Sequence, residues 1–549
     1  MDRETLQVVL QTFKDFTSRE LTRERCLELD ERDEYPEDLV NEMMGEELGL
    51  HLVFLPEEYG GLGGGAYDVY RVSLALAEAD LGIATAFFAI SLGTDPLRVG
   101  GTDEQKQKWM TRIAEEGLVV AYGVTEPAAG SEVSAIKTTA RRVTDDDGNV
   151  TGYVLDGTKQ FITNGGVATI YTILAKTEDG PSFFVVERGT EGLSAGRSEE
   201  KLGIRASNTT QVVLEDVHVP ADNLIGGVEG QGLIHAQQVF GYTRVMVAAF
   251  GLGAGAEALR IARDYSKERI QYGSALAAKQ GFTHSLLVPH AVALEASRTY
   301  IEYVAGRLDE GDEGLGTEGA IAKLTATEAG NAAADAAIQA HGGYGYIREY
   351  HVEKIRRDVR ITTLYEGTSE IMRNTIAMDR WRASIQSRFS YYDDLAVSMD
   401  ALSESDPGCG GGMVAHASRA LNQVLRTARE HKLTRKQYVL FLLGDMMAGV
   451  ETAACLARRA SQIRSNGGKE EGLLFVIDAE AAGALARTWA RRVGWDVVSR
   501  ASYCTAGTGR LGGDALEAVR AFVAPDRFFM AGEGAEADMD LIASRITEG

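Results

Sequence analysis

Paired cysteines are missing from this sequence. It has four cysteines in 549 residues, Cys26, Cys409, Cys455 and Cys504, and none of them forms a Cys-x-x-Cys pair. Disulfide scaffolds and cysteine-based zinc sites depend on such pairs, so the sequence argues against both and favours a reducing compartment. We therefore expect no bound metal.

Positive charge is scarce. The chain has 56 Lys and Arg against 80 Asp and Glu, a formal net charge of −24. Nucleic-acid binding needs clustered basic residues, so this class of function is excluded. A local basic pocket for one phosphorylated small molecule is compatible with the overall charge.

Long apolar runs are also missing. The most apolar stretches, residues 83–92 and 439–443, are shorter than the roughly 20 residues that a membrane-spanning helix needs. The first residues, Met1-Asp2-Arg3-Glu4, lack the features of a secretion signal or a transit peptide. The content of 44% hydrophobic and 25% charged residues is typical of folded globular chains. We expect a soluble, cytoplasmic protein.

The hydrophobic pattern alternates between helical and β regions. Near the N-terminus, apolar residues recur at intervals of three and four, which predicts helices up to about residue 117. Residues 118–226 contain short runs rich in Val, Ile, Thr and Tyr, with Asp145-Asp-Asp-Gly-Asn149 as a hairpin signal. No helical pattern interrupts them, which favours an antiparallel barrel or sandwich. The predicted strands are residues 119–124, 136–143, 150–155, 169–175, 182–186 and 209–219.

The remainder of the chain is predicted to be helical. Residues 227–384 carry Ala-rich amphipathic patterns, residues 385–412 include a polar, Gly-rich stretch typical of a linker, and residues 413–549 continue as helices. The fold class is therefore mainly α with a central β domain. The expected parts are a helical domain (1–117), a β domain (118–226), a second helical domain (227–384), a linker (385–412) and an additional helical domain (413–549).

Two glycine patterns resemble nucleotide-binding motifs. Gly507-Thr-Gly-Arg-Leu-Gly512 fits Gly-x-Gly-x-x-Gly, but such a motif must follow a strand, and its surroundings are helical. Gly251-Leu-Gly-Ala-Gly255 lies inside a helical run. We interpret both as structural, the second as a surface where helices pack closely.

Three other segments contain candidate ligand-binding and catalytic groups. The turn from Tyr122 to Glu132 offers backbone N–H groups and the hydroxyls of Thr125 and Ser131 to a planar polar ligand. Phe161 and Thr163 are two residues apart, hence on one face of an extended segment. Glu366 lies in a loop after an apolar stretch, where partial desolvation suits a general base. Each has a purely structural alternative: a strand-ending turn, a buried Phe beside a satisfied Thr, and a surface Glu.

Six segments occur in a fixed order. They are Pro56-Glu-Glu-Tyr-Gly-Gly-Leu-Gly63, Val124-Thr-Glu-Pro127 with Gly130-Ser131, Lys159-Gln-Phe-Ile-Thr-Asn-Gly165, Arg269-Ile-Gln-Tyr-Gly273, Gln339 with Gly342-Gly343, and Tyr365-Glu-Gly-Thr-Ser-Glu370. In this order the chain resembles the acyl-CoA dehydrogenase family of flavoenzymes over about residues 1–381. The resemblance implies an N-terminal helical domain, a central β domain and a C-terminal four-helix domain.

The resemblance further implies an FAD site between the β domain and the last helices. Thr125 and Thr163 would bond to the flavin ring, with Phe161 against its face, where family members often have Trp. The FAD of a neighbouring subunit would be reached by Arg269, Gln280, Gln339 and Gly343, and the adenosine end by Thr368 and Glu370. Family members often have Gln in place of Glu370. A shared cofactor implies an obligate homo-oligomer, a dimer or tetramer.

The implied reaction is α,β-dehydrogenation of an acyl-CoA thioester to the 2-enoyl-CoA. Glu366 would take the α-proton while the β-hydride passes to flavin N5, with the backbone N–H of Glu366 and an FAD hydroxyl bonding to the thioester oxygen. Some relatives place the base just before the CoA-binding Arg, and Thr243 stands there in this chain. The substrate contacts implied are Ser131, which also adjoins the cofactor, Arg244, Tyr365 and Gly367. The frequent Asp three residues before that Arg is Gly241 here.

Three points are left open by the sequence. The electron acceptor is expected to be an electron-transfer flavoprotein, with an oxidase using O₂ or a flavin-binding scaffold without turnover as alternatives. The tail is similar in length and helical character to the extension of the very-long-chain subgroup, which accompanies dimers and membrane association. The basic residues Arg487, Arg491 and Arg492 are sparse, so an extra helical layer on an oligomer surface is favoured over membrane association. Residues 83–88 carry no basic side chain, which favours an apolar acyl chain or ring over a dicarboxylate.

Overall fold

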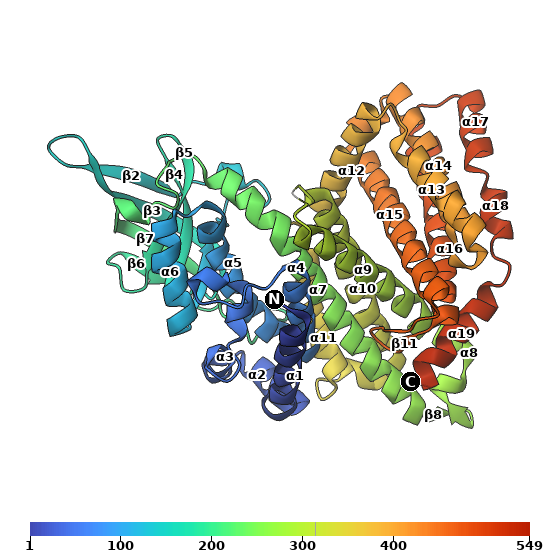
Figure 1. Cartoon of the computed structure of the whole chain (residues 1–549), viewed down its shortest axis with the longest axis horizontal. Coiled ribbons are helices and arrows are strands. Elements are labelled where there is room, and N and C mark those ends of the chain that lie inside the picture. The colour runs from blue at the N-terminus through green and yellow to red at the C-terminus, as the bar shows by residue number, and fades with distance from the viewer. Residues whose placement is uncertain (313, 549) are drawn as a thin grey trace. The chain divides into compact units, whose positions relative to one another are not determined.

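The computed structural model describes residues 1–312 and 314–548, which cluster into two compact units. The first unit comprises Met1–Met246, Leu308–Gly311 and Arg357–Ile361. The second comprises the described parts of Val247–Arg307, Asp312–Arg356 and Thr362–Gly549. Figure 1 shows the helices and strands of both units along the chain.

Six α-helices begin the first unit, in the region that the sequence predicts to be helical. Capping side chains start the first and last of them: Asp2 accepts a hydrogen bond from the Thr5 amide at 2.8 Å, and Thr102 and Gln105 form a capping box. The helices are α1 (Arg3–Glu20), α2 (Arg23–Arg32), α3 (Glu37–Met44), α4 (Ala66–Ala79), α5 (Leu81–Gly100) and α6 (Asp103–Glu116).

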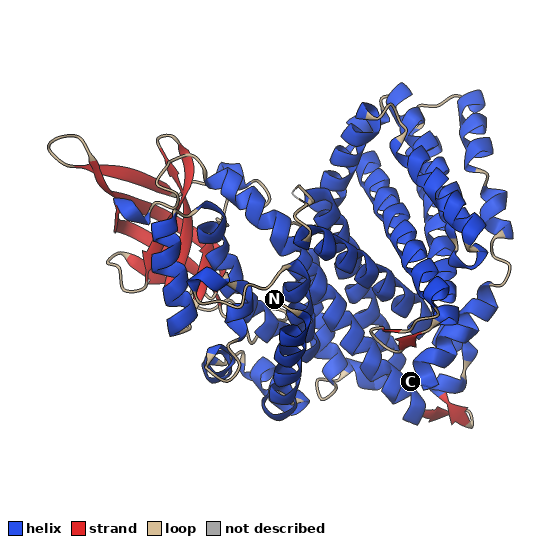
Figure 2. Ribbon diagram, in the orientation of Figure 1, coloured by secondary structure: helices blue, strands red, loops and turns tan. Residues whose placement is uncertain are grey.

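A seven-stranded sheet follows (Figure 2). Its path is β1-β4-β2-β3-β7-β6, with β5 paired to β4. The predicted β domain is confirmed, and most pairings are antiparallel. The exceptions are the parallel pairing of β1 with β4 and a one-residue parallel pairing of β2 with β4. The short β6 was not predicted. The strands are β1 (Val120–Gly123), β2 (Thr139–Thr144), β3 (Val150–Thr163), β4 (Ile170–Thr177), β5 (Gly180–Glu187), β6 (Leu193–Ala195) and β7 (Thr209–Pro220).

Helix α5 covers one face of this sheet. A Cβ on Gly93 would overlap Val120 and Ala121 of β1, so only glycine permits this approach. The hydroxyl of Thr172 donates to the Gly93 carbonyl at 2.8 Å, and the Asn164 amide donates to the Ala86 carbonyl at 2.8 Å. The first bond ties β4 to α5, and the second ties the turn after β3 to the same helix.

The second unit is built almost entirely of helices. α7 (Gly232–Glu268) contributes residues to both units. The other elements are β8 (Ile270–Gln271), β9 (Ser274–Ala275), α8 (Gln280–Phe282), a π-helical turn (Thr283–Leu287), α9 (Val288–Asp309), α10 (Gly316–His341), α11 (His351–Val359), α12 (Ser369–Gln386), α13 (Tyr391–Ser405), α14 (Gly411–Glu430), α15 (Gln437–Asn466), β10 (Glu470–Glu471), β11 (Val476–Ile477), α16 (Ala479–Cys504), α17 (Gly513–Val523), α18 (Pro525–Met530) and α19 (Ala535–Glu548).

Both glycine motifs are structural in this fold. A Cβ on Gly330 of α10 would overlap the Gly251 carbonyl of α7, and Gly255 faces the Gly330 Cα. The motif from Gly507 to Gly512 follows a helix, α16, and not a strand. Neither segment therefore has the setting of a dinucleotide fold.

Two segments differ from the sequence-based expectation. The predicted linker, residues 385–412, contains helix α13, whose Tyr392, Ala396 and Met399 are buried.

The apolar stretch at 439–443 belongs to α15, and both α7 and α15 are long and apolar enough to cross a membrane. Most of each apolar window is buried inside the fold, 83% and 67% respectively, as in the core helices of soluble proteins.

Candidate active site

The loop after β1 is tied to the end of β3 within the first unit. The Thr125 carbonyl accepts a hydrogen bond from the Gln160 amide at 2.8 Å. The Val124 carbonyl accepts one from Lys159 Nζ at 3.2 Å. Thr125 is half-buried and Ser131, farther along the loop, is exposed. The loop thus presents hydroxyls from a fixed backbone.

A buried ion pair underlies this loop. Lys159 Nζ lies 2.7 Å from Glu126 Oε1, and the two side chains are 0% and 4% exposed. Glu126 also accepts the amides of Lys137 and Thr138, at 2.6 and 3.0 Å. Burial lowers the pKa of Lys159 to about 8. Burial alone would raise the pKa of Glu126, but its bonds from Lys159 and Thr138 outweigh this and lower it.

Phe161 projects from β3 in a strained conformation. Its φ is +57°, in the left-handed region that bulky residues rarely adopt. The pairing of β3 with β7 shifts register between Lys159 and Ile162, which places this residue in a bulge. The side chain is 63% exposed, while Gln160 and Ile162 on either side are buried. An exposed ring held this way, with half-buried Thr163 two residues on, suits a flat heterocycle.

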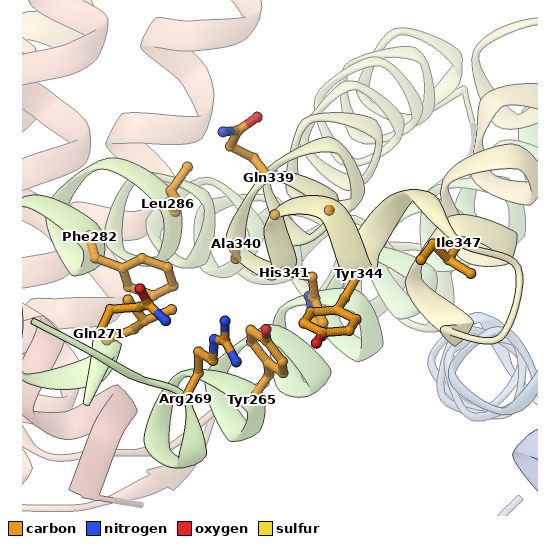
Figure 3. Close-up of a pocket in the computed structure, with 13 residues that line it drawn as sticks. Tyr265, Arg269, Gln271, Phe282, Leu286, Gln339, Ala340, His341, Tyr344 and Ile347 are labelled. Atoms are coloured by element: carbon orange, nitrogen blue, oxygen red, sulfur yellow. The ribbon is translucent and has the colours of Figure 1, made fainter. Parts of the chain in front are cut away.

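A pocket of about 570 Å³ lies in the second unit (Figure 3). This volume is in the range of small-molecule and cofactor sites. Arg269, Gln339 and Gly343, three of the residues expected at a neighbouring subunit's FAD, line it together. The remaining lining residues are Tyr265, Gln271, Leu276, Phe282, Leu286, Ala340, His341, Gly342, Tyr344 and Ile347.

The chemistry of the pocket fits the phosphate and ring parts of FAD. The Arg269 guanidinium lies 5.6 Å from the centre of the Tyr344 ring, and Figure 3 shows Tyr265 beside it. Tyr265 stacks on His341 with ring centres 4.3 Å apart. A Cβ on Gly342 or Gly343 would meet only open space, so a ligand can approach the backbone closely.

Gln280, the fourth residue expected at this cofactor, is held by the C-terminal extension. Its amide donates to Glu536 Oε1 at 2.9 Å and to Asp540 Oδ1 at 3.1 Å, both on α19. The same Asp540 oxygen lies 3.2 Å from His284 Nε2. Gln280 is not among the residues that line the pocket.

Glu366 occupies a strained loop before α12, in the second unit. Its φ is +54° and that of Gly367 is +95°, two consecutive left-handed residues. Buried Lys323 of α10 donates from Nζ to the Gly367 carbonyl at 2.7 Å. Thr368 caps α12, its hydroxyl accepting the Ile371 amide at 3.3 Å. Such strain persists only where neighbouring bonds impose it, and it is concentrated at functional sites.

The predicted site residues are divided between the two units. Thr125, Ser131, Phe161, Thr163 and Arg244, which is half-buried on α7, belong to the first unit. The second unit holds Arg269, Gln280, Gln339, Gly343, Tyr365, Glu366, Gly367, Thr368 and Glu370. Among residues 1–312 and 314–548, no group of His, Cys, Asp and Glu is arranged to hold a metal ion.

Sequence reasoning missed several residues of these sites. Lys159 is the first residue of the Lys159–Gly165 segment, but its ion pair with Glu126, 33 positions earlier, is a tertiary contact that the sequence pattern does not indicate. Tyr265 lies in the last turn of α7, four residues before Arg269, which directly follows the helix and whose amide bonds to the Tyr265 carbonyl at 2.9 Å. This helical spacing places both residues on one face and could have identified Tyr265. The tail's contact with Gln280 left no sequence signal.

The described domains match one family throughout. Residues 3–117 match "Acyl-CoA dehydrogenase, N-terminal domain", residues 121–217 match "Acyl-CoA dehydrogenase, middle domain", and residues 230–380 and again 395–546 match "Acyl-CoA dehydrogenase, C-terminal domain". The chain belongs to the acyl-CoA dehydrogenase family. As a member of this family it is an oxidoreductase with FAD as its cofactor. Its C-terminal extension is a second match to the same domain.

Individual relatives agree with this assignment. An acyl-CoA dehydrogenase of Bacillus subtilis is 37% identical over 374 residues, 66% of this chain and 94% of its own. Butyryl-CoA dehydrogenase from Megasphaera elsdenii is 34% identical, with a TM-score of 0.65 over 69% of this chain and 99% of its own. An acyl-CoA dehydrogenase from Bacillus anthracis, solved with FAD, covers 100% of this chain and 95% of its own, with a TM-score of 0.84 at 24% identity. The last shares the fold, extension included.

Proposed function

We propose that Glu366 is the base that removes the α-proton of an acyl-CoA thioester, giving the 2-enoyl-CoA. The observation that carries this is the loop at half-buried Glu366, where Glu366 and Gly367 both have a positive φ and Lys323 bonds to the Gly367 carbonyl. A carboxylate held in one orientation removes a carbon-bound proton more effectively than a mobile one. Its backbone N–H is the proposed donor to the thioester oxygen, where negative charge develops.

The proposed flavin contacts lie on the first unit. FAD, when bound, supplies the acceptor for the hydride that leaves the β-carbon. Thr125 and Thr163 would hold the flavin ring, and Phe161 would lie against it. The proposal is supported by the fixed backbone of the Thr125 loop and by the exposed, strained Phe161 ring.

The proposed CoA contacts are Ser131 and Arg244, with Tyr365 and Gly367 beside the thioester. Arg244 is suited to a phosphate because a guanidinium donates several hydrogen bonds in one plane. The acyl chain is proposed to be apolar, linear or cyclic. Support comes from residues 83–88 of α5, which are buried and contain no basic group for a distal carboxylate.

The proposed assembly is a homo-oligomer that shares cofactors. Arg269, Gln339 and Gly343 would bind the FAD of a neighbouring subunit, and Gln280 would join them. Thr368 and Glu370 would contact the adenosine end. The pocket shared by three of these residues supports the proposal.

The proposed electron acceptor is an electron-transfer flavoprotein. The Tyr365-Glu366-Gly367-Thr368 sequence supports this over oxidation by O₂, because related oxidases depart from that pattern. Retention of Glu366, Thr163 and Arg244 argues against a scaffold without turnover.

The experiment is an anaerobic screen of flavin bleaching over linear, branched, cyclic and dicarboxylic acyl-CoAs. Glu366→Gln should retain FAD and ligand binding but reduce flavin about 10²–10⁴-fold more slowly. Glu404→Gln, on an exposed face of α13, is the control. Flavin reduction in Glu366→Gln at the wild-type rate would refute the assignment of Glu366 as the base. Hydrogen peroxide as product would identify an oxidase, and no reduction by any thioester would identify a scaffold.

A further inference from the structure

The C-terminal extension repeats the architecture of the domain before it. Residues 395–546 and 230–380 match the same family domain. Helices α10 and α16 each have 26 residues. Each is followed by a short 3₁₀ turn, two shorter segments and a final helix. The glycine motif at Gly507 is thus the counterpart of the glycines that follow α10.

The repeat keeps the fold but places its own glutamate on the surface. Glu533-Gly534 directly precedes α19, one residue nearer to its helix than Glu366-Gly367 is to α12. Glu533 is exposed, and its carbonyl accepts a hydrogen bond from Arg491 at 3.0 Å. A role for the extension must therefore be sought in its contacts with residues 230–380, and the most extensive of these is the packing of α15 against α12.

Helix α15 of the extension crosses α12 at a glycine. A Cβ added to Gly444 would overlap the backbone carbonyl of Arg373. Backbone contact of this kind leaves no side chain to adjust, so the spacing of the two helices is fixed at this point.

Beside the crossing, Asp445 of the extension forms an ion pair with Arg373 of α12. Asp445 Oδ1 lies 2.8 Å from Arg373 Nε, and the two side chains are 20% and 22% exposed. Arg373 also lies 3.5 Å from Glu328 of α10 and 3.6 Å from Glu370. A partly buried pair that shares its arginine with other carboxylates fixes the position of the side chain more firmly than an exposed pair.

A second ion pair joins the helices two turns farther on. Glu451 of α15 accepts two hydrogen bonds from Arg380 of α12, at 2.7 and 2.8 Å, and one from Tyr392 at 3.0 Å. Arg380 reaches Glu318 of α10 at 3.0 Å as well. The two carboxylates of α15 thus hold α12 along its length as well as at the crossing.

Helix α12 begins three residues after Glu366. Thr368 caps it, and Arg373 lies little more than one turn inside it. On the other side, Lys323 holds the Gly367 carbonyl. The loop that carries Glu366 is therefore held between α10 and α12, and any shift of α12 along α15 reaches the loop directly.

We propose that the C-terminal extension positions Glu366 through α12, with Gly444 and Asp445 as positioning residues. The inference rests on the proposed role of Glu366 as base. The relative from Bacillus subtilis aligns with 66% of this chain over 94% of its own length, so it has no α15 in the same chain to hold its α12 counterpart. The extension supplies that support within one polypeptide.

The experiment uses the full chain with FAD bound. Gly444→Ala should force α12 and α15 apart, and Asp445→Asn should remove the ion pair with Arg373. Both should lower the anaerobic rate of flavin reduction by about 10-fold or more, since small displacements of a catalytic group are costly, with acyl-CoA affinity unchanged. Amide hydrogen exchange in residues 362–376 should rise in both.

Asp406→Asn is the matched control, because it breaks an ion pair of 2.9 Å with Arg464 that lies wholly within the extension. Asp406→Asn should leave both the amide hydrogen exchange of residues 362–376 and the rate of flavin reduction at wild-type values. Unchanged exchange and rate in Gly444→Ala and Asp445→Asn would overturn the proposal, as would an equal loss in Asp406→Asn. A wild-type protein that reduces no flavin would refute the proposed function, and the exchange measurement would then still test the link from α15 to the loop.

Discussion

Lys159 Nζ lies 2.7 Å from Glu126 Oε1 beneath the loop that carries Thr125, and both side chains are almost completely buried. The pair joins β3 to the turn after β1, and Lys159 also holds the Val124 carbonyl. A buried pair is costly to break on one side only, because the remaining charge stays buried without its partner.

We therefore expect Lys159→Met to lower the free energy of unfolding by about 3–5 kcal/mol and to reduce the FAD content of the purified protein. Urea denaturation and the ratio of flavin to protein absorbance measure the two effects. The double variant Glu126→Gln with Lys159→Met should recover part of the stability. An unchanged urea midpoint in Lys159→Met would show that the pair contributes nothing to the loop.

Arg269→Ala should weaken FAD retention and subunit association together. The guanidinium is the basic group of the pocket lined by Gln339 and Gly343, and a charge-assisted bond to phosphate contributes about 1.5–3 kcal/mol. Arg269→Lys keeps the charge but loses the guanidinium group that lies beside the Tyr344 ring. Its FAD affinity should fall between those of the wild type and Arg269→Ala. FAD dissociation constants and light scattering after gel filtration test this. Equal affinity in all three proteins would assign the pocket to another ligand.

The double variant Glu536→Gln with Asp540→Asn should bind FAD a few-fold more tightly than the wild type. Both carboxylates bond to Gln280, and their negative charge opposes phosphates approaching that amide over a range of about 10 Å. Titration of the apoprotein with FAD at low and high salt provides the measurement. Asp526→Asn, on α18, serves as a surface control. Weaker binding in the double variant would mean that the carboxylates hold Gln280 in its binding position.

Acid stability should depend on Glu229. Burial would raise the pKa of Glu229, but hydrogen bonds from Arg142 and Tyr153, at 2.7 and 2.8 Å, outweigh it and lower the pKa to about 2. Because the folded pKa lies below the usual 4.5, the stabilisation is complete above about pH 4.5 and is lost as pH falls toward about 2.

Glu229→Gln should accordingly lower Tm at pH 6–7, and the difference from wild type should shrink steadily below pH 4.5. Glu178→Gln is the control, since Glu178 bonds to the same Arg142 but is 72% exposed and should change Tm little. A difference in Tm between Glu229→Gln and the wild type that stays constant down to pH 2.5 would contradict the lowered pKa of Glu229.

Local patterns in the sequence were sufficient for the helical and β regions. Alternation and turn residues located the strands, and the Asp145 hairpin forms as expected, with the Asp145 amide bonding to the Asn149 carbonyl. The three-residue β6 is too short to show alternation. Helix α13 was assigned to a linker because its polar residues and the glycines after it obscured the buried Tyr392 and Met399.

The candidate site was predictable as residue types but not as contacts. Arg269, Gln339 and Gly343 line one pocket, and their contact with FAD stays a prediction. Two features depend on tertiary packing between distant segments. They are the bond of Gln280 to α19 and the positive φ of Phe161 in its bulge. Periodicity and spacing carry no information on such pairings.

The contact between α12 and α15 has a consequence for attempts to obtain a smaller enzyme. A chain shortened to the length of the relative from Bacillus subtilis would end near residue 384. Arg380 would then lose both bonds to Glu451. Gly444 would no longer cover the Arg373 backbone. Such a fragment should precipitate or self-associate rather than behave as a minimal dehydrogenase.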